Sequence, residues 1–401
     1  MGDFFQNGVI TTFHKLGKFN LRRLEDELKE FSKMRKIALI LPALYREFEG
    51  DALPRIINEL RKIKYLRQIV LCLDKADKNQ FEKAKKILSP CKKIEIIWND
   101  GPRIKELYKI LEDNELSPGS GGKGRAVWIS MGYILATGEC QVIALHDCDI
   151  INYNRTMLAR LCYPVANPSF DYEFCKGYYC RVTDRMHGRV TRLFYTPFIR
   201  ALQKMLGYLP FLVYMDSFRY ALSGEFSMRT DLAMVSRIPG DWGLEVGTLA
   251  EVYKNVALHR ICQVDIADSY EHKHQELDPD NPEKGLLKMV IDISRSIFRT
   301  LASEGVQFSE GFFKSLSTTY IKIAKDTITQ YENDAAINGL YFDRHQEALA
   351  VETFTKGINI AGEQFWENPF ETFLIPSWSR VISAIPNFFD LIKEAVKKDN
   401  S

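Results

Sequence analysis

One stretch, residues 121–150, constrains the fold more than any other part of the chain. It reads as a glycine-rich loop, a helical segment and a short apolar run, Gln141 to Leu145, which is followed by Asp147 and Asp149. The run has the length and β-branched content of a strand that is buried on both faces of a parallel sheet. Ligands of α/β proteins bind at the ends of such strands, and carboxylate oxygens suit Mg²⁺ or Mn²⁺. The acidic pair is therefore a candidate metal site that would hold a diphosphate, with a solvated loop as the alternative.

Composition and charge exclude several classes of protein. Hydrophobic residues make up 46% and charged residues 26% of the 401, as in ordinary globular proteins. The 54 basic and 52 acidic residues leave a net charge of +2, so we expect no nucleic-acid partner. Without a run of about 18 apolar residues, we expect no membrane span. The eight cysteines include no CxxC pair, which favours a reducing, cytoplasmic setting.

Strand-like and helical segments alternate through the first part of the chain, before the acidic pair. The strand-like segments are 36–44, 68–74 and 93–98, and the helical ones are 52–64, 80–88 and 103–112. This alternation predicts βαβ units and a mostly parallel sheet, which is an α/β fold with Asp147 and Asp149 after its fourth strand.

The pattern changes twice further along the chain. The aromatic, alternating segment 171–182 indicates an antiparallel or mixed strand pair, and from about residue 282 the chain is almost wholly helical. We therefore predict four parts, in chain order. They are an N-terminal helical lead (1–35), the nucleotide-sugar half (36–150) and the acceptor half (151–281) of one catalytic domain, and a helical C-terminal extension (282–401).

Two glycine-containing segments are candidate anion sites. Lys123 is the penultimate residue of the glycine-rich loop 117–124, which is no P-loop because Gly124 follows the lysine in place of Ser or Thr. Gly188, Arg189 and Thr191 precede a helical stretch. Backbone N–H groups and basic side chains at a helix start can bind a phosphate, whereas a solvated linker and an ordinary basic helix start are the alternatives.

Two other clusters carry acids or histidines. Asp241 and Glu245 are four residues apart and would share a helix face, where they could bind sugar hydroxyls or only stabilise the helix start. His272 and His274 follow a strand-like segment. A neutral imidazole can complete a metal shell that carboxylates begin, although a surface histidine pair is more often inert.

Together these segments resemble the glucosyl-3-phosphoglycerate synthases, which are nucleotide-sugar-dependent glycosyltransferases. The matching stretches lie in the family's order between Lys36 and Gln275. They are LPAL (41–44), GKG (122–124), HDCD (146–149), GRVT (188–191), LSGEF (222–226), DWGLEVG (241–247) and YEHKHQ (270–275). GRVT is the most specific of them, because mannosylglycerate synthases, the nearest competing family, share several of the others.

The resemblance implies a single Rossmann-like domain of the GT-A type with a mixed, mostly parallel sheet. It also implies the roles of individual residues. Pro42, Ala43 and Leu44 would line the uracil and ribose pocket, and Lys123, Asp147, Cys148, Glu225 and Glu245 would contact the nucleotide sugar. Asp149 and His272, with His274 as second choice, would hold Mg²⁺ or Mn²⁺, and Gly188, Arg189, Val190 and Thr191 would bind the acceptor. Glu245, Asp147 and Arg189 would carry the catalysis.

The implied reaction is the retaining transfer of glucose from UDP-glucose to the 2-hydroxyl of 3-phospho-D-glycerate. Separately, the apolar C-terminal helices predict a homodimer. The chain departs from the family pattern at Tyr45 and Arg46, where an Asn-Glu pair is usual, and at Cys148, where Ser is common. The helices after Pro282 fall outside the matching motifs. A mannosylglycerate synthase-like transferase that uses GDP-mannose and D-glycerate, and a non-catalytic nucleotide-sugar-binding protein, remain the alternatives.

Overall fold

The computed structural model describes residues 6–18, 20–271, 281–369 and 374–401. Within them, eight strands form one sheet in the order β1-β9-β6-β7-β5-β2-β3-β4. The strands are β1 (Thr11–Phe13), β2 (Ile37–Leu44), β3 (Leu66–Asp74), β4 (Ile94–Trp98), β5 (Val142–Leu145), β6 (Phe174–Tyr179), β7 (Phe226–Arg229) and β9 (Ile261–Ala267). All neighbours pair in parallel except β7, which is antiparallel to both β5 and β6.

The central strands are buried on both faces, as the sequence predicts. Along β2, Ile37, Leu39 and Leu41 belong to one hydrophobic cluster, whereas Ala38 and Ile40 belong to the other. Each cluster is completed by helices that cover one face of the sheet. The first face carries α1 (Leu21–Phe31), α2 (Ala52–Leu60), α3 (Lys78–Leu88) and α6 (Arg155–Ala166), and the second carries α4 (Pro102–Asp113) and α5 (Lys123–Thr137). The four predicted strands up to Leu145 are confirmed.

The acceptor half differs from its prediction in one respect. The segment 171–182 contains one strand, β6, and not a strand pair. Its mixed character comes from its neighbours, because β6 is parallel to β9 and antiparallel to β7. The other elements of this half are short. They are α7 (Thr196–Leu206), α8 (Pro210–Asp216), α9 (Thr230–Val235), β8 (Ile238–Pro239) and α10 (Leu244–Asn255).

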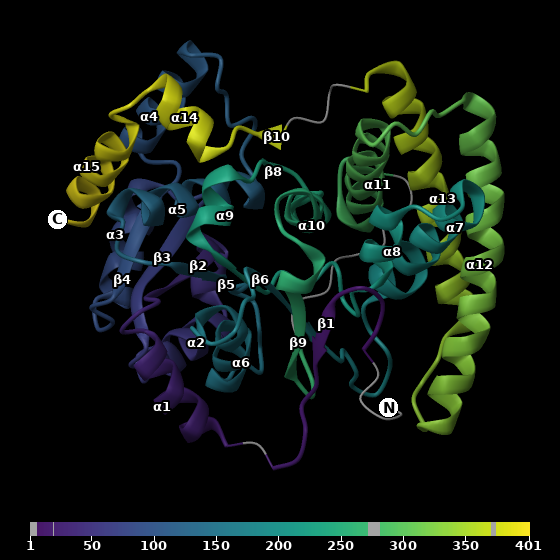
Figure 1. The fold of residues 1–401 in the computed structure, drawn as a ribbon, viewed down its shortest axis with the longest axis horizontal. Coiled ribbons are helices and arrows are strands. Elements are labelled where there is room, and N and C mark those ends of the chain that lie inside the picture. Colours follow the sequence, from purple (N-terminus) through teal and green to yellow (C-terminus); the bar gives the residue numbers. More distant parts are fainter. Residues whose placement is uncertain (1–5, 19, 272–280, 370–373) are drawn as a thin grey trace.

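The C-terminal extension packs on two opposite sides of the sheet domain. Helices α11 (Gly285–Ser303), α12 (Glu310–Ile337) and α13 (Arg344–Glu367) cover α7 and the neighbouring helices (Figure 1). The chain then returns through β10 (Leu374–Ile375), which pairs with β8. The last helices, α14 (Trp378–Ala384) and α15 (Phe388–Asn400), lie beside α4, α5 and β4 (Figure 1). The helical C-terminal end of the chain is thus interrupted at Ile385 to Asn387, around Pro386.

Specific contacts fix this return. The Trp378 ring stacks on Trp128 of α5 with the ring centroids 4.1 Å apart. The Asn400 side chain binds both backbone groups of Ile96 in β4, accepting from its N at 2.9 Å and donating to its O at 2.8 Å. Asn400 thereby pairs the backbone N–H and carbonyl of one residue of the edge strand, which would otherwise stay unpaired.

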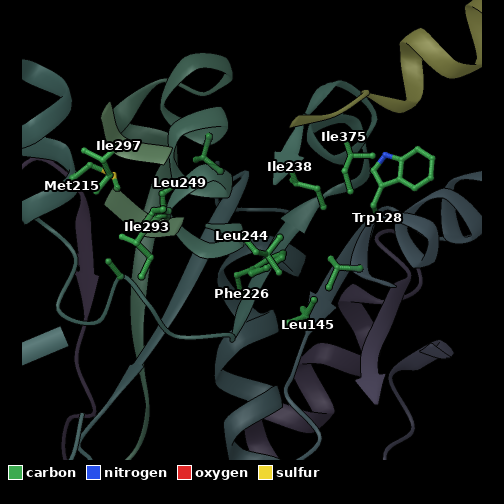
Figure 2. Close-up of a cluster of buried hydrophobic side chains, with 14 of the residues drawn as sticks. Trp128, Leu145, Met215, Phe226, Ile238, Leu244, Leu249, Ile293, Ile297 and Ile375 are labelled. Carbon is green, nitrogen blue, oxygen red and sulfur yellow. The ribbon is translucent and has the colours of Figure 1, made fainter. Parts of the chain in front are cut away.

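One hydrophobic cluster runs from the extension into the sheet domain. In Figure 2, Ile293 and Ile297 of α11 lie near Leu249, and Ile375 lies beside Trp128 on the far side of Leu244. The division at residue 282 stays a prediction, although both parts contribute to this core. Within the described ranges, each helix is too short or too polar to cross a bilayer.

Candidate active site

The acidic site forms where β5 ends and β7 begins. Because β7 is antiparallel to β5, Phe226 at its start faces Leu145 at the end of β5. This register places Glu225 beside the acidic loop, and the backbone N–H of Asp147 donates to Glu225 Oε1 at 3.4 Å. A Cβ on Gly224 would lie 2.3 Å from an oxygen of the Asp147 carboxylate. The close approach of the Asp147 carboxylate to Gly224 therefore requires a glycine at this position of the LSGEF motif.

Lys123 contacts two acids from distant parts of the chain, Asp147 and Glu245, the second of which lies 122 positions after the lysine. Its Nζ is 2.7 Å from Asp147 Oδ1 and 3.0 Å from Glu245 Oε1. Although burial favours the neutral amine, the two carboxylates more than offset it and raise the pKa of Lys123 well above its usual range. The sequence-predicted donor residues Lys123, Asp147 and Glu245 are thus brought together at one edge of the sheet.

Glycines of the loop before α5 make this arrangement possible. A Cβ on Gly124 would lie 2.0 Å from the carbonyl oxygen of Pro239, and one on Gly122 would lie 2.8 Å from that of Gly240. The start of α5 can therefore approach the segment that leads into α10. Asp241 precedes α10, so the predicted helix face shared with Glu245 is wrong. Its carboxylate instead accepts from the backbone N–H of Gly243 at 2.8 Å.

Asp149 is a partly buried carboxylate in an acidic environment. Burial, and secondarily the charge of Asp147, raise the pKa of Asp149 to about 7, and Glu47 adds to the effect. A divalent cation would relieve the cost of holding these acids together, so Asp149 fits a metal-ligating role. The predicted partners His272 and His274 lie outside the described residues. Among those that are described, no group of three or more His, Cys, Asp or Glu side chains could hold a metal.

Glu47 was missed by the sequence analysis. It is buried in the short 3₁₀ helix η1 (Tyr45–Glu49) that follows β2, where the chain departs from the family's Asn-Glu pair. The signal was available, since an acid three residues after a strand end faces the same sheet edge as the acidic pair.

Glu225 is a fully buried carboxylate that organises the acidic loop. It accepts from Tyr270 Oη at 2.7 Å, Tyr179 Oη at 2.9 Å and Ser223 Oγ at 3.0 Å. The two tyrosine rings stack on each other with centroids 3.7 Å apart. Burial and the nearby Asp147 raise the pKa of Glu225. Its contact with the nucleotide sugar stays a prediction, whereas these hydrogen bonds hold the carboxylate where it accepts from the Asp147 backbone of the acidic loop.

Lys176 is a second residue that the sequence analysis missed. It lies on β6 with its amine fully buried, and Nζ donates to the carbonyl oxygen of Ser223 at 2.6 Å. Burial lowers the pKa of Lys176 to about 8, although Glu245 and Glu225 act in the opposite direction. In an alternating aromatic segment, a lysine is expected on the exposed face of a strand. The carboxylates near Lys176, Glu225 and Glu245, are distant in sequence, so only the folded structure shows that they lie beside it.

The predicted base pocket lies at the ends of β2 and β3. Pro42, Ala43 and Leu44 pair with the last residues of β3, which ends at Asp74. Asp74 is buried and accepts from Asn99 Nδ2 at 2.9 Å. Polar groups therefore gather beside these three residues.

The Cys148 side chain points into the protein core and not toward a ligand. Its thiol lies in the hydrophobic cluster beneath the sheet edge, and burial raises the pKa of Cys148 well above its usual range. Any contact of this residue with a nucleotide sugar must therefore come from its backbone.

The GRVT motif forms the start of a π-helix, η2 (Val190–Tyr195), and Arg189 is its N-cap. Gly188 has a φ of +73°, a backbone conformation that glycine adopts without strain. A Cβ on Gly188 would lie 3.8 Å from Tyr220 Oη. The Tyr220 ring packs edge-on against Tyr179, which donates a hydrogen bond to Glu225. Gly188, the first of the predicted acceptor residues, therefore lies near Tyr220, whose ring neighbours the acidic site, and the acceptor role of Arg189, Val190 and Thr191 stays a prediction.

Comparison with known proteins identifies the family. No family model matches the chain. It is 52% identical over 402 residues to the glucosyl-3-phosphoglycerate synthase of Persephonella marina, with 100% of both chains covered. It is 39% identical to the one of Methanococcoides burtonii, over 99% of this chain and 98% of the relative. The chain belongs to the glucosyl-3-phosphoglycerate synthase family.

Members of the glucosyl-3-phosphoglycerate synthase family are glycosyltransferases, and this chain is one of them. Its similarity to the two relatives covers the C-terminal helices, which the sequence motifs did not reach. The helical extension is therefore a shared part of these family members and not an unrelated addition.

Solved structures confirm the GT-A type fold. The glucosyl-3-phosphoglycerate synthase of Mycobacterium tuberculosis in complex with Mn²⁺, UDP-glucose and phosphoglyceric acid is similar over 75% of this chain and 89% of its own, with a TM-score of 0.54 and 19% identity. The mannosyl-3-phosphoglycerate synthase of Rubrobacter xylanophilus is similar over 75% and 84%, with a TM-score of 0.57 and 21% identity.

Proposed function

We propose that this enzyme transfers glucose from UDP-glucose to the 2-hydroxyl of 3-phospho-D-glycerate, with retention, to give glucosyl-3-phosphoglycerate. The observation that carries the proposal is the convergence of Lys123, Asp147 and Glu245 at the sheet edge, in a chain that is 52% identical to a glucosyl-3-phosphoglycerate synthase over its full length. The M. tuberculosis relative supports the substrates, because its complex contains UDP-glucose and phosphoglyceric acid.

On the donor side, Pro42, Ala43 and Leu44 would hold the uracil and ribose. Asp147 would contact the ribose or sugar, and Lys123 would face the diphosphate. Departure of UDP places negative charge on the diphosphate, and the Lys123 ammonium is positioned to stabilise that charge. Glu245 would contact the glucose, and the Lys123 contact fixes its carboxylate.

A divalent cation, Mg²⁺ or Mn²⁺, would supply further electrostatic stabilisation of the leaving diphosphate when bound. Asp149 and His272, or alternatively His274, would hold it. The burial of Asp149 beside Asp147 supports this assignment, and the M. tuberculosis complex contains Mn²⁺.

On the acceptor side, Gly188, Arg189, Val190 and Thr191 would bind the phosphate of 3-phosphoglycerate. Fixing that phosphate aims the 2-hydroxyl at the anomeric carbon and makes the attack effectively unimolecular. We propose that the leaving phosphate removes the hydroxyl proton on the same face of the sugar. Trapping a covalent glycosyl adduct on Glu245 would contradict this route.

A matrix of donors and acceptors tests the proposal. UDP- and GDP-hexoses are each assayed with 3-phosphoglycerate and D-glycerate, with and without EDTA and with Mg²⁺ or Mn²⁺ restored. We expect glucose transfer from UDP-glucose to 3-phosphoglycerate, its loss with EDTA and in Arg189→Ala, and its retention in Arg200→Ala, which alters an exposed arginine of α7. Transfer of mannose to D-glycerate would support the mannosylglycerate synthase alternative. A chain without transferase activity, unchanged by Asp149→Ala, would support a binding protein.

We also propose a cytoplasmic homodimer that makes a precursor of the compatible solute glucosylglycerate. All eight cysteines lie in the described ranges without a disulfide, as a reducing compartment requires. Light scattering coupled to size exclusion tests the dimer, and a monomeric mass would contradict it.

A further inference from the structure

The C-terminal extension contacts Arg189 through Glu347 of α13. Arg189 Nε donates to Glu347 Oε1 at 2.8 Å, and Glu347 lies in the first turn of α13 with 5% of its side chain exposed. Arg189 itself keeps 35% of its side-chain surface exposed. Within the described ranges, the polar side chain that Arg189 contacts is Glu347. This contact uses Nε of the guanidinium and leaves its two terminal nitrogens available to bind a ligand.

Arg192, one turn further along, is used differently. Its Nη1 lies 2.9 Å from Glu347 Oε2, and its Nε donates to the carbonyl oxygen of His187 at 2.9 Å. Its guanidinium also lies over the Tyr331 ring, 4.9 Å from the centroid, and only 10% of the side chain is exposed. The Arg192 guanidinium is therefore occupied by contacts within the protein. Arg189 binds the same carboxylate, but its guanidinium stays partly exposed.

Other contacts hold the chain on both sides of Arg189 to the extension. Before it, the backbone N–H of Tyr341 donates to the carbonyl oxygen of Asp184 at 2.8 Å, and the Arg185 guanidinium lies over the Tyr341 ring. After it, Tyr320 of α12 donates its hydroxyl to the carbonyl oxygen of Leu193 at 2.7 Å. Helix α12 and the segment between α12 and α13 thus fix the backbone that carries the GRVT motif, and Glu347 fixes the side chain of its arginine.

We propose that Glu347 is a positioning residue of the acceptor site, which holds Arg189 so that its two terminal nitrogens face the phosphate of the acceptor. The helical extension is then a working part of that site. The inference rests on the proposed function, because it takes the phosphate of 3-phosphoglycerate as the partner of Arg189.

Two effects of removing Glu347 oppose each other. The carboxylate neutralises one of two guanidinium charges, so its loss increases the positive charge near the phosphate. Its loss also frees a long side chain that must be ordered again when the acceptor binds. Arg189 is partly exposed and solvent screens the added charge, whereas bidentate phosphate binding depends on the orientation of the guanidinium. Weaker acceptor binding is therefore the expected net result.

Steady-state kinetics of Glu347→Ala and Glu347→Gln test the proposal. We expect the KM for 3-phosphoglycerate to rise about tenfold or more in Glu347→Ala and by less in Glu347→Gln, which keeps a hydrogen-bond acceptor. The KM for UDP-glucose should stay within about twofold, because the residues proposed to hold the uracil, ribose and diphosphate (Pro42, Ala43, Leu44 and Lys123) lie in the other half of the domain. Glu363→Gln, which alters an exposed carboxylate of the same helix, is the matched control and should behave as wild type.

A double-mutant cycle separates positioning from general destabilisation. If Glu347 acts through Arg189, adding Glu347→Ala or Glu347→Gln to Arg189→Ala should raise the acceptor KM no further. An unchanged or lower acceptor KM in the single variant, an equal rise in both KM values, or additive effects in the cycle would overturn the inference. Should Glu347→Ala fail to fold, Glu347→Gln and its cycle decide. A wild-type enzyme that does not glucosylate 3-phosphoglycerate would instead overturn the proposed function.

Discussion

Lys123 Nζ lies 2.7 Å from Asp147 Oδ1, so the start of α5 and the end of β5 meet at one ion pair. Glu245 completes the contact at 3.0 Å. We expect Lys123→Ala to lower kcat/KM for UDP-glucose by about 10²- to 10³-fold, because the variant loses a fixed cation beside the developing charge. Lys123→Arg should recover part of the activity, and Lys105→Ala, at an exposed position of α4, should have none of these effects. Wild-type rates in Lys123→Ala would remove the lysine from the mechanism.

The tyrosine pair above Glu225 yields a second prediction. Tyr270→Phe removes the hydroxyl that donates to Glu225 Oε1 at 2.7 Å, leaving that oxygen with the longer contact from the Asp147 backbone. We expect a loss of about 1–2 kcal/mol in the free energy of unfolding, because a buried acceptor loses its partner. Activity should fall as well, since Glu225 holds the acidic loop.

Urea denaturation and initial rates measure both effects. Tyr208→Phe is the control, because Tyr208 has 79% of its surface exposed. A Tyr270→Phe variant with wild-type stability would show that the hydrogen bond to Glu225 contributes nothing to the fold.

The sequence was sufficient to predict the four strands up to Leu145, whereas the roles of the donor residues stay predictions. The apolar run before Asp147 and the alternation of strands with helices are local patterns, and they determine where strand ends meet. The nearness of Lys123 to Glu245 was implied only by the family resemblance, because it depends on the backbone approach of Gly124 to Pro239. No local pattern contains that approach.

Other parts of the site depend on contacts between distant segments. Lys176 looks like a surface lysine until β7 and α10 bring carboxylates near it. The pairing of Arg189 with Glu347 joins residues 158 positions apart, and the helical spacing of α13 indicates only that the helix exists. The packing of α15 against β4 could not be predicted from the sequence either, since the apolar face of α15 would fit many surfaces.

A pH-dependent prediction concerns Asp292 of α11. Burial raises the pKa of Asp292 to about 6, and the neighbouring Asp241 adds to the effect while Lys288 and Arg295 oppose it. The folded protein then binds this proton more tightly than the unfolded chain does, so stability is lost as pH rises from about 4 through about 6. Asp292→Asn removes that loss.

We therefore expect Asp292→Asn to be about 1–3 kcal/mol more stable than wild type at pH 7.5 and nearly equal to it at about pH 4. Thermal unfolding at the two pH values measures the difference. Asp390→Asn, at an exposed position of α15, should show no such pH dependence. A lower stability of Asp292→Asn at pH 7.5 would mean that the contact with Lys288, at 3.6 Å, outweighs the cost of burial.

The last prediction concerns the packing of Trp378 against α5. A Cβ on Gly132 would lie 2.0 Å from the Trp378 ring, so Gly132→Ala should overpack this contact and cost about 1–3 kcal/mol. Trp378→Ala should cost about 3–5 kcal/mol by leaving a cavity. In the double variant the added methyl group enters space that the indole has left, so Gly132→Ala should cost nothing there or stabilise. Denaturant unfolding of the four proteins gives the coupling energy. Additive losses would show that Gly132 is constrained by something other than Trp378, and that the C-terminal segment is not fixed by this stack.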